Sequence, residues 1–216
     1  MIRIRITHTK TGALRYTGNL DMQKVWERTF RRARLPLAYS QGFHPQPRIN
    51  QACPLPLGFS STVELLDFWL NEPMPLQDIR SAIELALPGG VSIHKIEEVD
   101  QHAPALQTQV DTSEYIIILR QDVNPLELEA RVTEVLSASS LPRERRGKMY
   151  DLRPLIMAMR IVSNPDLPIL LHLTLTVREG ATGRPEEVLS ALGLDPYKTS
   201  IERTQLHLKP SQPLNS

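Results

Sequence analysis

The stretch Ile2-Arg-Ile-Arg-Ile-Thr7 places an isoleucine at every second position. Successive side chains of a strand point to opposite faces, so this alternation predicts a half-buried strand. A helix should follow, capped by Asn19 or Asp21 and running to about Arg34. The other elements expected in this half are an irregular strand over 48–52, a strand over 63–70, a helix over 75–87 and a strand over 91–99.

The second half of the chain restarts the same order of elements. Strands are predicted over 115–119, within 148–162 and over 169–177 and 201–208, with helices over 124–137 and 184–192. Each half therefore reads βαββαβ, the split βαβ or ferredoxin-like plan. We predict an α+β protein with two tandem ferredoxin-like βαββαβ domains. The predicted domains are 1–100, which carries a proline-rich loop, and 113–210, with a linker at 101–112 and a disordered tail at 211–216.

The composition is typical of a folded chain rather than a disordered one, with 41% hydrophobic and 23% charged residues among 216. A formal net charge of +1 gives no global sign of a nucleic-acid partner, so any electrostatic argument must rest on local clusters. Cys53 is the only cysteine, which excludes an intrachain disulfide and a three-cysteine iron–sulfur motif. No apolar run approaches ~18 residues, and the first residues do not resemble a signal peptide, so we expect a cytoplasmic protein without a membrane partner.

The first helix is predicted to carry a basic face. Lys24, Arg28 and Arg31 recur at i, i+4 and i+7, and Arg32 follows them. Such a stripe suits contact with RNA phosphates. The alternative is an ordinary solvent-exposed helix face, part of whose positive charge is offset by Glu27.

A proline-rich stretch from 35 to 58 follows this helix. Within it, Tyr39, Phe43 and His44 supply flat rings, and Arg48 supplies a planar cation. Phe43 or His44 could stack on a base while Arg48 holds a phosphate. The alternative is a connection wrapped on the core with Phe43 buried. Binding is favoured, because packing alone does not account for the polar residues interleaved with these rings.

A second basic loop, Arg143-Glu-Arg-Arg-Gly-Lys148, lies in the other half of the chain. Its Arg145 and Arg146 could add phosphate contacts, although an exposed loop is the simpler interpretation when it is taken alone. The next residues bring Asp151 and Arg153 two positions apart, where they would share one face of a strand and could form an ion pair.

Acidic residues give no diagnostic pattern. Asp21, Glu64 and Asp67 could serve a metal ion or act as a general base, but their spacing fits no known ligand set, and a capping role is predicted for Asp21. No metal site is therefore predicted in this chain.

Several short motifs along the chain carry a family resemblance. They are Leu14-Arg-Tyr16, Asn19-Leu-Asp21, Glu27-Arg28, Arg31-Arg32-Ala33, Leu35-Pro-Leu-Ala-Tyr-Ser-Gln-Gly-Phe43, Pro45, Pro47-Arg48, Pro54-Leu-Pro-Leu-Gly58, Lys148, Tyr150-Asp-Leu-Arg-Pro-Leu-Ile156 and Gly183-Arg-Pro-Glu-Glu-Val188, which includes Arg184. Together these motifs resemble the radical-SAM-linked family, a bacterial domain of unknown function that is fused to radical S-adenosylmethionine enzymes or encoded beside them.

The resemblance implies work on tRNA or rRNA beside a radical SAM enzyme, with S-adenosylmethionine and an iron–sulfur cluster in that partner only. Two motifs depart from the family pattern. The family has Ser-His-Leu-Asp where this chain has Gly18-Asn-Leu-Asp21, and Phe-Asn-Pro-His-Pro-Arg where it has Phe43-His-Pro-Gln-Pro-Arg48. Because a family histidine is replaced in both motifs, a binding surface is favoured over histidine-dependent chemistry.

The leading hypothesis is an RNA-binding accessory protein that presents structured RNA to a separate radical SAM enzyme. Tyr39, Phe43 and His44 would position a nucleotide. Phosphates would be held by Lys24, Arg28, Arg31, Arg32, Arg48, Arg145 and Arg146.

Two alternatives remain open. The first is a metal-independent RNA endonuclease, in which His44 or Tyr39 activates a ribose hydroxyl and Lys24 or Arg48 stabilises the charged transition state. The second is a protein–protein adaptor for the radical SAM enzyme that makes no contact with RNA.

Overall fold

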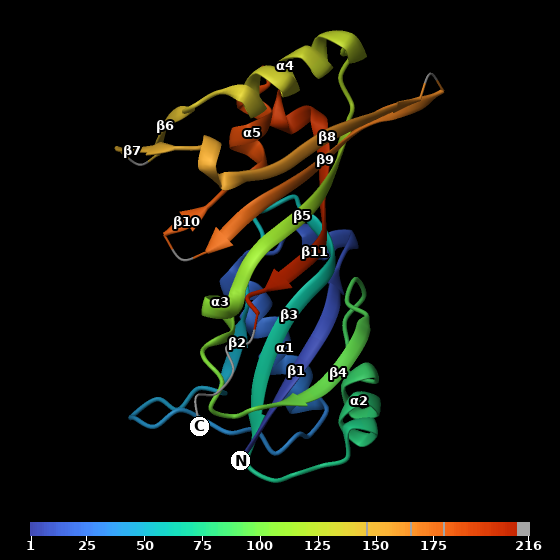
Figure 1. Cartoon of the computed structure of the whole chain (residues 1–216). Coiled ribbons are helices and arrows are strands. Elements are labelled where there is room, and N and C mark those ends of the chain that lie inside the picture. Colours follow the sequence, from blue (N-terminus) through green and yellow to red (C-terminus); the bar gives the residue numbers. More distant parts are fainter. Residues whose placement is uncertain (146, 165, 179, 211–216) are drawn as a thin grey trace. The chain divides into compact units, whose positions relative to one another are not determined.

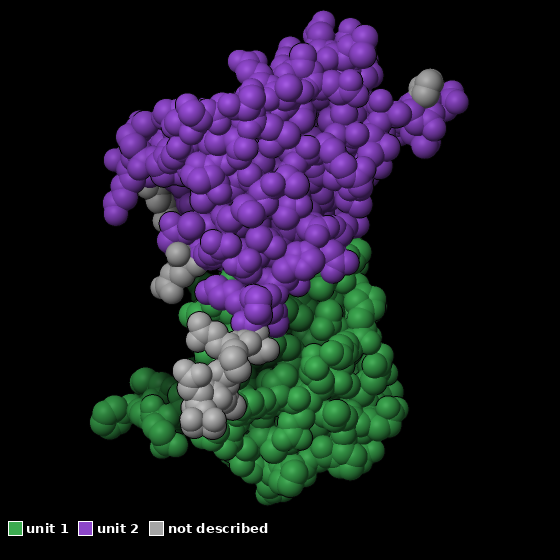
Figure 2. Space-filling model, in the orientation of Figure 1, with its two compact units in different colours: residues 1–110 green, residues 111–216 purple. Residues whose placement is uncertain are grey.

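The computed structural model describes residues 1–145, 147–164, 166–178 and 180–210 (Figure 1). The chain divides into two compact units, unit 1 (Met1–Val110) and unit 2 (Asp111–Ser216), which Figure 2 colours green and purple. Both units combine helices with antiparallel strands, so the predicted α+β class is confirmed. The tail predicted at 211–216 lies outside the described residues.

Unit 1 contains a four-stranded antiparallel sheet with the order β2-β3-β1-β4. This order is compatible with the predicted ferredoxin-like plan, and the assignment to that fold stays a prediction. The strands are β1 (Ile2–Lys10), β2 (Ile49–Gln51), β3 (Ser60–Leu70) and β4 (Ile93–Val99). The helices are the 3-10 turn η1 (Gly12–Tyr16), α1 (Asn19–Arg32), α2 (Leu76–Glu84) and α3 (Leu106–Gln109).

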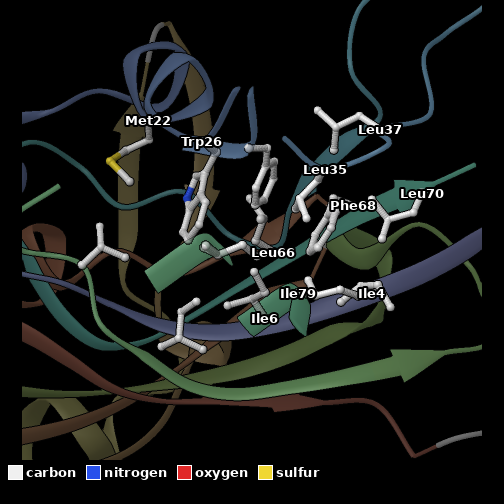
Figure 3. Close-up of a cluster of buried hydrophobic side chains, with 14 residues drawn as sticks. Ile4, Ile6, Met22, Trp26, Leu35, Leu37, Leu66, Phe68, Leu70 and Ile79 are labelled. Atoms are coloured by element: carbon white, nitrogen blue, oxygen red, sulfur yellow. The ribbon is translucent and has the colours of Figure 1, made fainter. Parts of the chain in front are cut away.

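One face of this sheet forms the core of unit 1. Ile4 and Ile6 of β1 are fully buried and lie beside Phe68 and Leu66 of β3 in the strand register. Aromatic rings extend this core, since the ring centroids of Phe30 in α1 and Phe68 lie 4.4 Å apart. Figure 3 shows these side chains converging between the sheet and the helices. Each such side chain contributes about 1.5–3 kcal/mol through burial, so this cluster anchors α1 to the sheet.

The other face of β1 is also buried, which the alternating pattern did not predict. Arg3 and Arg5 are 1% and 7% exposed, and both donate to the carboxylate of Asp67 in β3, which is 0% exposed. Nε of Arg3 lies 2.8 Å from Oδ2, and Nε of Arg5 lies 2.8 Å from Oδ1. A buried charge needs a partner and further hydrogen bonds, and this arrangement gives each guanidinium a carboxylate oxygen.

The segment predicted to be a linker packs over this charge cluster. Arg3 donates through Nη1 to the carbonyl of Ala103 at 2.6 Å and through Nη2 to that of Pro104 at 3.0 Å. Leu106 of α3 is 0% exposed, and Gln109 lies 3.3 Å from a guanidinium nitrogen of Arg5. Residues 103–109 therefore belong to the packing of unit 1 rather than forming an open connection.

The predicted cap of α1 is wrong. The helix begins at Asn19, and Gly18 stands at the N-cap position without a side-chain hydrogen bond. Asp21 lies in the first turn instead, where a negative charge interacts favourably with the helix dipole, and it pairs with Lys24 at 3.7 Å. The helix predicted over 124–137 has a side-chain cap, because Oδ1 of Asn124 accepts from the amide of Leu126 at 3.0 Å.

In unit 2, β9 lies between β8 and β5, and β11 lies beside β5. The strands are β5 (Val110–Leu119), β6 (Pro142–Arg145), β7 (Lys148–Asp151), β8 (Ile156–Asn164), β9 (Leu167–Arg178), β10 (Ala181–Thr182) and β11 (Thr199–Leu208). The helices are α4 (Pro125–Ser137), α5 (Pro185–Ala191) and the 3-10 turns η2 (Arg153–Leu155) and η3 (Pro196–Lys198). The single strand predicted within 148–162 is therefore two strands separated by η2, and β7 pairs with the unpredicted β6.

Alternation along β5 and β9 sets the two faces of this second sheet. Tyr115 and Ile117 of β5 are buried, as are Leu171 and Leu173 of β9. The residues between them point to the opposite face and are only partly buried. That second face carries polar side chains.

The buried charge cluster gives a test of stability. Replacing Asp67 with alanine leaves the guanidinium groups of Arg3 and Arg5 buried without their carboxylate. We expect a loss of about 3–5 kcal/mol in the free energy of unfolding, measured by urea denaturation. Replacement of the exposed Asp122 with alanine is the control. Equal unfolding midpoints for the two variants would show that the cluster does not hold unit 1 together.

Candidate nucleic-acid interface

The motif loop, defined here as residues 39–47, projects from unit 1 as the pale blue loop at the lower left of Figure 1. Its two ends are joined by an isolated bridge between Tyr39 and Pro47. The amide of Ser40 also donates to the carbonyl of Gln46 at 2.8 Å, and Oγ of Ser40 accepts from the amide of Gln46 at 3.0 Å. The loop therefore has a closed neck, from which its tip extends into solvent.

The aromatic residues of the motif loop are accessible. Phe43 is 103% exposed, Tyr39 is 41% exposed, and His44 is exposed as well. The alternative in which Phe43 packs into the core is therefore wrong. Gly42 has a φ of 136°, which only glycine adopts readily, so the chain can turn at the tip just before Phe43. A flat apolar ring is thereby presented entirely to solvent.

Arg48 is fixed at the base of the motif loop. Its guanidinium lies 4.6 Å from the ring centroid of Trp69, and the backbone amide of Trp69 donates to the carbonyl of Arg48 at 3.2 Å. The guanidinium of Arg3 lies 5.0 Å from the same ring. A cation placed over an indole is held by the ring quadrupole, so Arg48 has a defined position while remaining partly exposed. Sequence reasoning missed Trp69, whose only signal was an aromatic residue within a predicted strand.

The basic residues of α1 lie on its solvent side. Lys24, Arg28, Arg31 and Arg32 are all exposed, whereas the buried residues of this helix include Trp26. Arg31 and Arg32 fall in the last turn, where cations interact favourably with the helix dipole. The predicted basic face therefore exists, and the segment after it leads directly into the motif loop.

The remaining basic candidates belong to unit 2. Arg145 ends β6 and stands opposite Lys148 across the β6–β7 hairpin. Arg146 lies outside the described residues. Arg184 is partly buried, and its carbonyl accepts from the amide of Glu187 at 3.1 Å in the first turn of α5. The structure thus gathers the aromatic candidates in the motif loop with Arg48 at its base, whereas Arg184 contributes to a helix start.

Asp151 and Arg153 organise the backbone around η2. Oδ1 of Asp151 accepts from the amides of Leu141 and Arg153 at 2.8 and 2.9 Å, and these bonds are the main reason why the pKa of Asp151 is lowered. The guanidinium of Arg153 donates to the carbonyl of Leu136 at 2.7 Å and to that of Ile156 at 3.0 Å. The hydrogen bond between Asp151 and Arg153 that organises the turn therefore involves the backbone amide of Arg153. The guanidinium ties the end of α4 to β8.

The acidic candidates do not form a metal centre. Asp67 is engaged by two arginines, and Asp21 pairs with Lys24 at the surface. Across the described residues, no group of three or more His, Cys, Asp or Glu side chains is placed to hold a metal ion. None of the described helices is long and apolar enough to cross a membrane.

Comparison with known families shows which family the chain belongs to. The family described as "Uncharacterized protein conserved in bacteria (DUF2344)" matches residues 3–185. The protein belongs to this family. The match includes α1, the motif loop and the turn around Asp151, so the candidate residues lie within the part of the chain that the family shares. Comparison with curated proteins gave no match.

Among solved structures, a chain in "Crystal Structure of a Cbf5-Nop10-Gar1 Complex" has a similar fold, with a TM-score of 0.53 and 10% identity over 94% of this chain and 48% of that one. A chain in "Structure of H/ACA RNP bound to a substrate RNA containing 2'-deoxyuridine" aligns with a TM-score of 0.48 and 10% identity, over 94% of this chain and 47% of that one. This protein therefore spans about half the length of both matches.

The pKa of Asp151 gives a test that depends on pH. A pKa lowered by folding stabilises the folded state above the ordinary pKa of the carboxyl, and this stabilisation is lost as the pH falls through the folded-state pKa. We expect Asp151→Asn to lower the melting temperature at neutral pH, and the difference from wild type to shrink as the pH falls below the ordinary pKa of an aspartate, about 4. Asp122→Asn serves as the control. A difference that stays constant with pH would show that the charge of Asp151 does not contribute.

Proposed function

We propose that this protein binds RNA through the motif loop, Arg48 and the basic face of α1. The observation that carries the proposal is the complete exposure of Phe43 at the tip of a loop with a closed neck. Because the large apolar ring of Phe43 is fully exposed, it is available for contact with a ligand. Every nucleobase has a flat face, so stacking on such a ring supplies affinity without requiring a particular sequence.

The charged groups around the loop are suited to bind the phosphate of a nucleotide. Arg48 is positioned by Trp69, and its planar donors match the geometry of a phosphate. Arg31 and Arg32 end the helix that leads into the loop and are exposed. The net charge of the chain is only +1, so attraction for RNA must come from such local groups. His44, next to Phe43, is assigned to contact with the same nucleotide.

We further propose that the RNA is a tRNA or rRNA and that its modification is carried out by a separate radical SAM enzyme. Support comes from the sequence motifs that resemble the radical-SAM-linked family. The chemistry of such an enzyme needs an iron–sulfur cluster, usually held by at least three thiolates, and this chain has Cys53 alone. S-adenosylmethionine and the cluster would therefore be bound by the partner, while this protein holds the substrate.

Phe43 provides the most direct test. Replacing it with alanine removes the stacking surface, which is worth about 1–3 kcal/mol per base, so we expect RNA affinity to fall roughly 5- to 150-fold. Binding of a mixed cytosolic tRNA and rRNA sample is measured by filter retention. Tyr197 is 98% exposed in unit 2, and its replacement with alanine is the matched control. If the two variants bind RNA equally well, the motif loop is not the contact.

The cations are tested by their salt dependence. Changing Arg31, Arg32 and Arg48 together to alanine should weaken binding. The slope of log affinity against log salt should become shallower by about 0.7 for each phosphate of single-stranded RNA that is no longer neutralised. Replacement of Arg120, Arg131 and Lys198 removes the same charge elsewhere and serves as the control. An unaltered slope in the first variant rules out this surface. A wild-type protein that binds a radical SAM enzyme but no RNA would instead support the adaptor.

A further inference from the structure

The polar face of the sheet in unit 2 contains a cavity of about 280 Å³. It lies across four strands, β8, β9, β5 and β11, which Figure 1 shows in the upper part of the chain. None of its lining residues was singled out by the sequence motifs or used in the proposed function. The side chains that carry the argument are Glu114, Ile116, Arg160, His172, Thr174 and Thr204.

The strand register brings these side chains together in two rows. In the first row, His172 of β9 stands between Arg160 of β8 and Ile116 of β5. In the second row, Thr174 stands opposite Glu114. Thr204 of β11 donates to the carbonyl of Glu114 at 3.4 Å, which places its side chain at the same end of the cavity. One cation, two hydroxyls and a carboxylate thus converge around an imidazole ring.

The contact between Arg160 and His172 defines the state of that ring. Nη2 of Arg160 lies 3.4 Å from Nδ1 of His172. A guanidinium can only donate hydrogen bonds, so Nδ1 accepts and the ring proton is on Nε2. Burial, and then the charge of Arg160, lowers the pKa of His172, against a smaller opposing effect of Glu114. The ring at neutral pH is therefore uncharged, flat and able to donate from Nε2.

Glu114 supplies an acceptor on the other side of the cavity. Its Oε1 lies 2.7 Å from Nε2 of His207. Among the described residues, the hydrogen bond of this carboxylate uses Oε1, so Oε2 can accept from a ligand. The cavity therefore offers a guanidinium at β8, a carboxylate at β5 and a flat ring beside the aliphatic Ile116 between them.

We propose that this cavity binds one ribonucleotide. The base lies against His172 and Ile116 and donates an N–H to Glu114, while the phosphate is held by Arg160. A nucleotide combines a planar heterocycle with N–H donors and an anionic group, and these are the features that the two ends of the cavity complement. An open antiparallel sheet is a common platform for an unstacked base. The inference rests on the proposed function where the nucleotide belongs to bound RNA, and a free nucleotide would offer the same chemistry.

The test uses the full chain with histidine labelled for NMR. Nucleoside 5'-monophosphates and a 12-nucleotide single-stranded RNA are added separately, and the ring signals of His172 are followed in each titration. We expect these signals to shift with RNA, and the affinity for RNA to fall roughly tenfold in Arg160→Ala because the phosphate no longer has its charge-assisted hydrogen bond. His94, which is exposed on β4, is replaced with alanine as the control. Thermal melting confirms that each variant is folded.

The outcomes separate the two proposals. If RNA binding depends on Phe43 but is unchanged in Arg160→Ala, with no shift at His172, the cavity is not a nucleotide site and the proposed function stands. If wild-type protein binds no RNA but its His172 signals shift with a monophosphate, the cavity takes free nucleotides and the proposed function fails. If neither ligand moves the His172 signals, the inference is overturned.

Discussion

The carboxylate of Asp67, fully buried between Arg3 and Arg5, is the constraint on which unit 1 depends. It requires two guanidinium groups to remain on the face of the sheet away from the apolar core. Arg3 in turn bonds the carbonyls of Ala103 and Pro104, which brings the segment after β4 over the sheet. The charges are stable inside the protein because each guanidinium bonds both the carboxylate and at least one further oxygen. Loss of the carboxylate would leave both cations buried without their counter-charge.

This charge cluster is continuous with the candidate interface. The guanidinium groups of Arg3 and Arg48 both lie against the indole ring of Trp69. The position of Arg48 at the base of the motif loop is therefore set by packing that begins in the centre of the sheet. A cation that must meet a ligand benefits from being held before the ligand arrives, because less side-chain entropy is lost on binding. The packing of the sheet thus fixes where the cation at the base of the loop lies.

The sequence predicted the elements better than their contacts. Alternating isoleucines located β1, and Asn124-Pro125 located the start of α4, because these signals are local. The burial of Arg3 could not be foreseen, since its partner Asp67 is 64 residues away and the pattern of β1 is the same for a solvated face. Exposure of the motif loop was left open by the sequence, because prolines and an aromatic ring also fit a connection wrapped on the core. The cavity around His172 could not be predicted, because its residues come from four strands and become neighbours only through the strand register.

The closed neck between Tyr39 and Pro47 has a consequence for how this scaffold can change. The hydrogen bonds that hold the neck lie at the ends of the segment, and the tip, including Gly42 and Phe43, is exposed and outside the core. Substitutions, insertions or deletions at the tip therefore leave the sheet and its helices undisturbed. The tip of the motif loop can therefore vary in sequence and length without a change of fold, so relatives could acquire different ligand preferences.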